Sequence, residues 1–162
     1  MAAAILGPQA APIFARMPAD AQRHSLNVLA LVREAGGQQP DLLQAALLHD
    51  AGKCAAAQAG IALSLWVRGP LVLLDAFFPK WVARWAVDDP ARGWRYLLHV
   101  HREHPTIGAQ WAAAAGCSPL CCWLIAHHQT PLDALPPHTS ENTPDDGRRE
   151  LLAALQAADR VD

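Results

Sequence analysis

The sequence predicts an all-α protein, a single-domain bundle of about six to eight helices over residues 1–162. Apolar residues recur every three or four positions in several segments, and no segment alternates apolar and polar residues as a half-buried strand does. The chain has 162 residues, of which 52% are hydrophobic and 17% charged. This length fits one domain with a sizeable core, and this composition excludes a disordered chain.

The first two predicted helices follow each other closely in the chain. Residues 20–35 carry apolar side chains at the spacing of one helix face. Asp20 is a suitable N-cap for this helix, and the Gly36–Gly37 pair can end it. The second helix is expected over residues 41–51, because a proline precedes it and Gly52 follows it.

Three further helices are predicted in the C-terminal half. Residues 105–115 have proline near the start and Gly116 after the end. Ser118–Pro119 opens the next helix with a capping residue and a proline at the first helical position. The last helix is expected from about residue 146 to 160. Residues 129–147, rich in proline and polar residues, are predicted to form a flexible loop.

An apolar helical insertion is predicted at about residues 55–102. Its most apolar part, residues 61–87, is interrupted by prolines and charges, whereas a membrane-spanning helix needs about 20 apolar residues in a row. Two or three short helices are therefore expected, buried in the core or in a homodimer. The alternative is attachment to a membrane surface. Its contacts would be the aromatic side chains Trp66, Phe77, Phe78, Trp81 and Trp85.

Charge and cysteine content predict a cytoplasmic protein with no nucleic-acid partner. The formal net charge is −2, so a basic field for nucleic acid is missing. The N-terminus lacks the basic start of an export signal, and Pro8 and Pro12 interrupt its apolar run. Of four cysteines, Cys121 and Cys122 are adjacent and cannot easily pair with each other. Reduced core thiols are the expected state.

Several predicted helices place metal-ligand types of side chain on their apolar faces. His24 lies on the apolar stripe of its helix, and His49-Asp50 follows an apolar run without a break. His128 and Asp159 each follow apolar residues by four and seven positions. Each alone fits a hydrogen-bonded core histidine or a surface carboxylate. Together they favour a shared divalent cation, because burying an unpaired carboxylate costs several kcal/mol.

These residues resemble a known family, the HD-domain superfamily of metal-dependent phosphohydrolases. The resemblance depends on the order of a histidine, a His-Asp pair and a late aspartate, in the strings RHSLNVLALV, AALLHDAGK and LLAALQAADRVD. A further block, EHPTIGAQWA followed by LIAHHQ, resembles the His-Pro and His-His segments of HD-GYP-like proteins. The resemblance covers residues 20–54 and 103–162.

The resemblance implies roles for individual residues. One divalent ion (Mn, Fe, Co, Ni, Zn or Mg) would be bound by His24, His49, Asp50 and Asp159. A second ion, or the substrate phosphate, would be contacted by His104, His127 and His128. Asp50 would also act in catalysis by orienting water, and Lys53 by contacting phosphate. Adjacent helix positions differ by about 100°, so His128, on the apolar stripe, is favoured over His127 as a ligand.

The sequence also departs from the family's pattern at two places, and these departures narrow the range of expected substrates. The Gly-Tyr-Pro signature is missing after His127-His128, which argues against cyclic di-GMP hydrolysis. The acidic pair that follows the His-Asp pair in (p)ppGpp hydrolases is replaced by Ala51-Gly52-Lys53. The expected activity is hydrolysis of a nucleotide or related small phosphate ester by a metal-activated water.

Two other functions stay open at this point. The chain could be a non-catalytic metal- or nucleotide-binding regulatory module. It could also be an apolar scaffold that dimerises or lies on a membrane through residues 61–87. Within the loop 129–147, His138 is either a contact to the site or a solvated residue. His99 and His101, expected to precede the helix of His104, have no assigned role.

Overall fold

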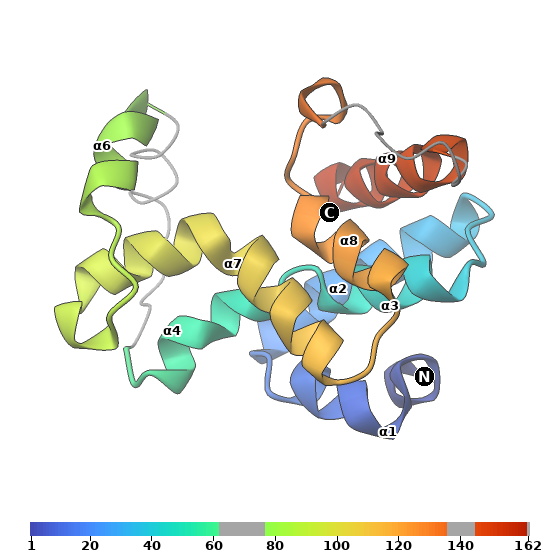
Figure 1. Cartoon of the computed structure of the whole chain (residues 1–162). Helices are drawn as coiled ribbons and strands as arrows, with labels where there is room; N and C mark the ends of the chain where they lie inside the picture. The colour runs from blue at the N-terminus through green and yellow to red at the C-terminus, as the bar shows by residue number, and fades with distance from the viewer. Residues whose placement is uncertain (62–76, 136–144, 162) are drawn as a thin grey trace.

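The regular structure in the described residues is entirely helical, as Figure 1 shows. It comes from a computed structural model that describes residues 1–61, 77–135 and 145–161. The predicted all-α class is therefore confirmed, with about seven helices. In chain order the elements are α1 (Ala2–Ala15), α2 (Ala19–Glu34), α3 (Pro40–Leu48), η1 (Ala51–Cys54), α4 (Ala55–Gln58), α6 (Pro79–Trp85), η2 (Pro90–Arg92), α7 (Trp94–Ala114), α8 (Pro119–His127), η3 (Leu132–Ala134) and α9 (Asp145–Val161).

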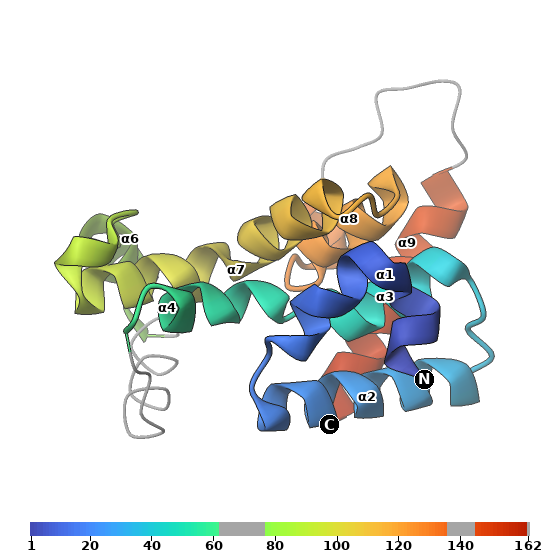
Figure 2. The ribbon, with the colours of Figure 1, turned by 90° about the horizontal axis from the view of Figure 1, so that it is seen from below.

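The main core lies between helices from both ends of the chain. It is enclosed by α1, α2, α3, α8, α9 and the C-terminal half of α7 (Figures 1 and 2). Leu47 and Leu48 of α3 are fully buried there, together with Leu124 of α8 and Leu155 of α9. Burying one such side chain stabilises the fold by about 1.5–3 kcal/mol. The helices that carry the predicted ligands are thus fixed by the core itself.

The backbone of η1 passes directly over α7 at two glycines. A Cβ atom on Gly52 would lie 2.0 Å from the carbonyl oxygen of His104 and 2.8 Å from the nitrogen of Gly108. Only a residue without a side chain allows two backbones to approach so closely. Because Asp50 lies two residues before Gly52, this contact holds the Asp50 turn against the helix that carries His104.

Gly52→Ala is expected to lower the free energy of unfolding by about 1–3 kcal/mol, because the added methyl group forces η1 away from α7. Gly147→Ala in α9 is the matched control, since its Cβ would meet nothing within 4 Å. Alanine there is expected to stabilise the helix by about 0.5–1 kcal/mol. Urea unfolding in the presence of a chelator measures both. A Gly52 variant as stable as the wild type would contradict the close approach.

The helix predicted over residues 105–115 begins much earlier, at Trp94, and that boundary prediction was wrong. Pro105 lies inside α7, where its missing N–H leaves the carbonyl of His101 without its helical donor. The Nδ1–H of His104 donates to that carbonyl at 2.8 Å. A side chain thus replaces the lost backbone bond, and the helix continues through the proline.

The starts of three other helices agree only in part with what the sequence predicts. The N-terminal segment, for which no helix was predicted, forms α1, in which Gly7 at φ 69° makes a kink and Pro8 follows it. α2 begins after Pro18, so Asp20 lies in the first turn instead of at the cap. There its negative charge still interacts favourably with the positive end of the helix dipole. Ser118 caps α8 as predicted, accepting a hydrogen bond from a backbone N–H.

A projecting arm is formed by residues 77–102, which comprise α6, η2 and the N-terminal part of α7. Figures 1 and 2 both show it extending away from the main core, with α4 beside α7. It has a small apolar core of its own, in which Tyr96, Leu97 and Val100 pack on Ala56 of α4. Helices therefore do occur in the predicted insertion, and one of them, α6, lies within the apolar stretch 61–87.

Part of the sequence predictions falls on residues 62–76 and 136–144, which lie outside the described residues. Trp66, His138 and much of the predicted loop 129–147 belong to this part. The described portion of that loop includes η3. Among the described helices, none combines the length and the apolar character that crossing a membrane requires.

Candidate metal centre

Six side chains of metal-ligand type meet inside the helical body in two groups of three. The first triad is His24, His49 and Asp159, and the second triad is Asp50, His104 and His128. Within each triad the ligand atoms lie within 4.8 Å of one another. The residues come from α2, the end of α3, α7, the end of α8 and α9. The structure thus brings together six of the seven residues predicted to contact a metal.

The first triad is a nearly equilateral triangle of ligand atoms. Nε2 of His24 lies 3.2 Å from Nε2 of His49 and 3.1 Å from Oδ1 of Asp159. Nε2 of His49 lies 3.2 Å from the same oxygen. Ligand atoms about 2.1 Å from a metal are about 3.0 Å apart in octahedral and about 3.4 Å apart in tetrahedral coordination. The triangle therefore fits one face of a divalent-ion site.

The second triad is buried and leaves two ring nitrogens without a partner. Nε2 of His104 and Nε2 of His128 make no hydrogen bond within the described residues. They lie 3.5 and 3.6 Å from Oδ1 of Asp50, which is too long for a good hydrogen bond. Both histidines are nearly inaccessible to solvent. Because an unsatisfied buried nitrogen is costly, a cation between these three atoms would stabilise the site.

The Asp50 carboxylate lies between the two triads. Its Oδ1 faces His104 and His128, while its Oδ2 lies 3.9 Å from Nε2 of both His24 and His49. One oxygen therefore points to each triad. A carboxylate placed in this way can join two cations. Asp50 thus lies within 4 Å of imidazole nitrogens from both triads.

Backbone carbonyls orient three of the imidazoles. Nδ1 of His49 donates to the carbonyl of Ala46 at 3.0 Å, and Nδ1 of His128 donates to that of Ile125 at 2.7 Å. Both carbonyls belong to the last turn of a helix, where no N–H of the helix can reach them. His104 uses the carbonyl that Pro105 leaves without a donor. In each case Nε2 is the nitrogen left to bind a metal, as in many metalloproteins.

Both carboxyl groups of the centre are held in the charged form. Burial would raise the pKa of Asp50, but the nearby His49 and the Lys53 ammonium group at 2.6 Å hold it well below its usual range. Burial acts likewise on Asp159, and contact with His49 lowers its pKa below normal. Both groups therefore provide negative charge to a cation at neutral pH.

The buried histidines respond in opposite directions. Burial lowers the pKa of His104 below its usual value, so its imidazole is neutral and ready to bind a metal. Burial also acts to lower the pKa of His49, but the contact with Asp159 and the nearby Asp50 charge raise it overall. His49 therefore keeps its proton to a higher pH, and a metal must displace that proton.

Metal affinity is expected to fall as the pH is lowered from about 8 to about 6. The pKa of His49 is raised, so its metal-binding form is present above that pKa and is lost as pH falls through it. One displaced proton makes the affinity change by up to about tenfold per pH unit. Calorimetric titration with Mn²⁺ in buffers of different ionisation enthalpy counts the protons released. Binding that releases no proton would contradict the expectation.

The Lys53 ammonium group forms an ion pair with the Asp50 carboxylate. Its Nζ lies 2.6 Å from Oδ2 of Asp50, while the lysine side chain is half exposed. The side chains of His24 and Asp159 are also partly exposed, at 26% each. The centre is therefore open to solvent on the side of these three residues and closed on the side of His104 and His128.

His127 is the predicted ligand that neither triad contains. Its ring packs on Trp123 with centroids 4.8 Å apart, and its Nδ1 lies 3.4 Å from Oγ1 of Thr130. Burial and the charge of Arg148 lower its pKa. His128, one position further, points into the second triad, as expected from the 100° step between neighbours on a helix.

His128→Asn is expected to remove one bound ion per chain, whereas His127→Asn is expected to leave the metal content unchanged. The two residues are adjacent, so the pair separates a ligand from a neighbour in the same helix turn. Metal analysis after dialysis against Mn²⁺ provides the measurement. Equal losses in the two variants would contradict the placement of His128 in the second triad.

Gln156 is a positioning residue that the sequence patterns did not single out. It is buried in α9, and its Nε2 donates to the carbonyl of Thr130 at 2.7 Å and to that of His127 at 3.4 Å. These bonds join the helix of Asp159 to the chain on both sides of His128. The sequence could have indicated Gln156 through its position about one turn before Asp159, which places both residues close to the same helix face.

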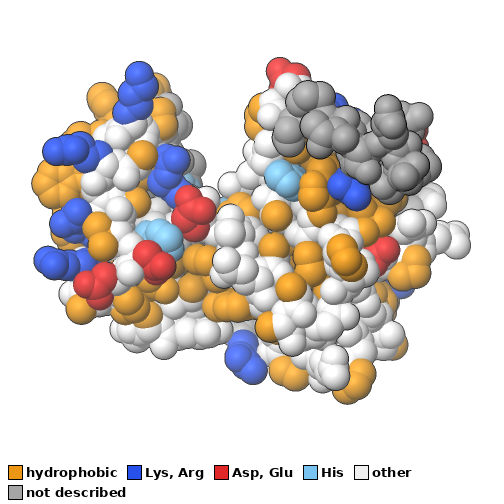
Figure 3. Space-filling model, viewed as in Figure 1, with side chains coloured by type: hydrophobic (Ala, Val, Ile, Leu, Met, Phe, Trp, Pro, Cys, Tyr) orange, Lys and Arg blue, Asp and Glu red, His pale blue; other side chains and the backbone are white. Residues whose placement is uncertain are grey.

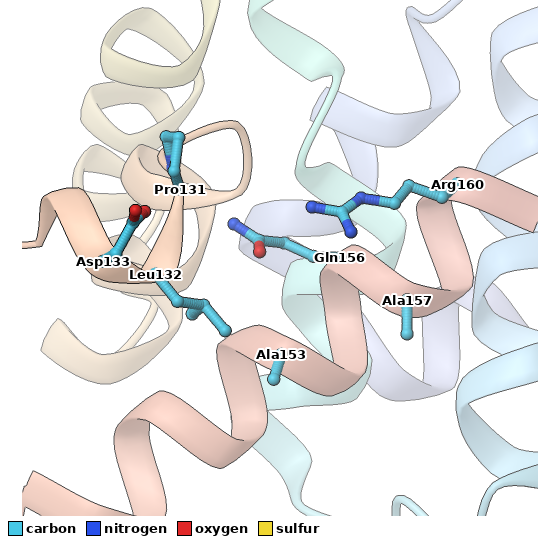
Figure 4. A pocket seen from close by; sticks show the side chains of 7 residues that line it. All are labelled: Pro131, Leu132, Asp133, Ala153, Gln156, Ala157 and Arg160. Carbon is cyan, nitrogen blue, oxygen red and sulfur yellow. The ribbon is translucent and has the colours of Figure 1, made fainter.

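A separate groove of about 470 Å³ lies between η3 and α9 (Figure 4). Arg160 and Gln156 project into the space between the two elements. Although Asp159 adjoins Arg160 in sequence, it does not line this groove, since neighbours on a helix point in different directions. The lining residues are Pro131, Leu132, Asp133, Ala153, Gln156, Ala157 and Arg160.

Comparisons with known proteins returned no match, whether with models of protein families, with curated proteins or with solved structures. The fold and the two triads therefore define the chain only as an all-α protein with a buried His/Asp cluster that could hold metal ions. Any more specific function has to be inferred from the geometry of that cluster.

Proposed function

We propose that the chain is a metal-dependent phosphohydrolase of the HD-domain superfamily, acting on a nucleotide or related phosphate ester. The observation that carries the proposal is the Asp50 carboxylate, with one oxygen toward each triad. Two-metal phosphatases hold their ions about 3.5–4 Å apart. A single carboxylate joining two histidine-rich triads suits such a pair.

The donor set indicates which ions fit the centre. Imidazole nitrogens and carboxylate oxygens suit borderline or hard divalent ions, and no thiolate belongs to either triad. Mn, Fe, Co, Ni and Zn are therefore candidates, and Mg is less suited to four histidines. A bound ion would supply a Lewis acid and lower the pKa of a water molecule.

The residues of the chain have distinct tasks in this proposal. Asp50 and Asp159 provide the negative charge that holds the cations, and the carbonyl-anchored histidines fix the direction of their Nε2 atoms. Lys53 is free to turn from Asp50 to a substrate once a cation neutralises that carboxylate. Its exposed ammonium group would then stabilise charge on phosphoryl oxygens at the open side of the centre.

The proposal is tested by phosphate release from a panel of nucleotides, phosphomonoesters and phosphodiesters with Mn²⁺-loaded protein. Turnover is expected for at least one class. Lys53→Met is expected to keep the metal content and lose activity, while Lys80→Met, a matched lysine on the arm, keeps both. Stoichiometric metal without turnover on the whole panel would overturn the hydrolase and favour a non-catalytic metal-binding module.

A further inference from the structure

The arm carries a concentration of exposed aromatic side chains. Phe77 is 73% exposed and Phe78 60% exposed, and three tryptophans lie near them. Apart from Met1 and Val161 near the chain ends, every large hydrophobic side chain exposed among the described residues belongs to this arm. The aromatic surface, as we call it here, consists of Phe77, Phe78, Trp81, Trp85 and Trp94.

The tryptophans of the aromatic surface are held in place. The rings of Trp81 and Trp85 have centroids 5.4 Å apart, and those of Trp85 and Trp94 are 5.7 Å apart. Arg95 donates from Nε to the carbonyl of Trp85 at 2.9 Å and lies 5.3 Å from the centroid of its ring. Val82, between them in α6, is fully buried. One face of α6 thus packs inward, and the aromatic surface remains outside.

Positive charge accompanies these aromatic groups. Residues 77–102 contain five cations and two carboxylates, whereas the whole chain has a net charge of −2. Figure 3 shows Lys and Arg side chains gathered on the arm around hydrophobic ones. The cations are Lys80, Arg84, Arg92, Arg95 and Arg102, and the carboxylates are Asp88 and Asp89.

We propose that the arm binds the surface of an anionic lipid bilayer. Tryptophan favours the boundary between headgroups and acyl chains, and arginine and lysine are attracted to anionic headgroups. Phe77 and Phe78 offer hydrocarbon without polar atoms, which suits acyl chains. Since no described helix can cross a membrane, the arm would lie on the bilayer and the helical body would stay outside it.

The charge of the arm favours an anionic bilayer over a second copy of the chain as its binding partner. A symmetric dimer through the aromatic surface would bring together two arms, each with five cations and only two carboxylates. An anionic bilayer complements them instead. α7 runs from Trp94 in the arm to His104 in the second triad, a distance of about 15 Å along the helix. The metal centre would therefore stay close to a bilayer without entering it.

The test is flotation of the full chain with vesicles of phosphatidylcholine alone or mixed with phosphatidylglycerol. Binding is expected to the mixed vesicles and to weaken with salt. The variants Lys80→Glu/Arg84→Glu and Phe77→Ser/Phe78→Ser are each expected to reduce the bound fraction by about tenfold or more. Arg16→Glu/Arg23→Glu changes the net charge equally, on exposed residues outside the arm, and is expected to bind nearly as the wild type does.

Three results would overturn the proposal. One is a wild type that floats with neither vesicle type. Another is an equal loss in the Arg16→Glu/Arg23→Glu control, which would show that only net charge matters. The third is a dimer in sedimentation equilibrium that Phe77→Ser/Phe78→Ser dissociates, since the aromatic surface would then cover a second copy. Helical circular dichroism of each variant confirms that the compared proteins are folded.

Discussion

Asp50→Asn is expected to lose both bound ions and to lower any metal-dependent turnover by about a thousandfold or more. The carboxylate faces the imidazoles of His104 and His128 on one side and those of His24 and His49 on the other. Asparagine keeps the shape but removes the charge, and its amide nitrogen cannot bind a cation. Metal analysis and phosphate release measure the two effects.

Asp88→Asn is the matched control for this variant. Asp88 is an exposed carboxylate on the arm that faces His99 and belongs to neither triad. The metal content and turnover of the Asp88→Asn variant are expected to equal those of the wild type. If Asp50→Asn retained two ions, the carboxylate would not join the triads and the proposed bridging role would be lost.

Removing metal is expected to lower the melting temperature of the wild type by about 10 °C for each ion removed. An ion present at about a thousand times its dissociation constant stabilises the folded state by about 4 kcal/mol. For a domain of this size, 1 kcal/mol corresponds to about 2–4 °C. The orphaned Nε2 atoms of His104 and His128 are the groups that lose their partner. Thermal unfolding with and without a chelator measures the shift.

The same experiment on Asp50→Asn provides the control. If this variant binds no metal, the chelator has nothing to remove and should leave its melting temperature unchanged. If the melting temperature of the wild type also stayed unchanged after complete metal removal, the buried polar side chains would be satisfied by hydrogen bonds to each other. That result would contradict a structural role for the ions.

Helical periodicity predicted much of the arrangement around the centre. The apolar stripes of α2, α8 and α9 identify His24, His128 and Asp159 as inward-facing. In the structure His24 and Asp159 meet in the first triad, and His128 lies in the second. Periodicity works here because each helix has one buried face, and the ligands lie on it. His49, His104 and the pairing of residues into triads came from the resemblance or from the structure, since spacing along one helix says nothing about its neighbours.

Two features could not be predicted from local patterns. Pro105 favoured a helix start, yet α7 continues through it because the His104 side chain occupies the carbonyl that the proline leaves free. Gly52 suggested the end of a helix, whereas its main role is the contact with α7. The Gly52 contact is made with residues that are distant in the sequence, and the continuation of α7 depends on the conformation of one side chain. A residue's sequence neighbours specify neither.

The most direct test of the central claim is an anomalous difference map from crystals of the Mn²⁺-loaded protein. Two peaks are predicted, about 3.5–4 Å apart. One would lie among His24, His49 and Asp159 and the other between His104 and His128, with Asp50 touching both. A map with no peak in either triad, or with peaks only elsewhere on the molecule, would contradict the account.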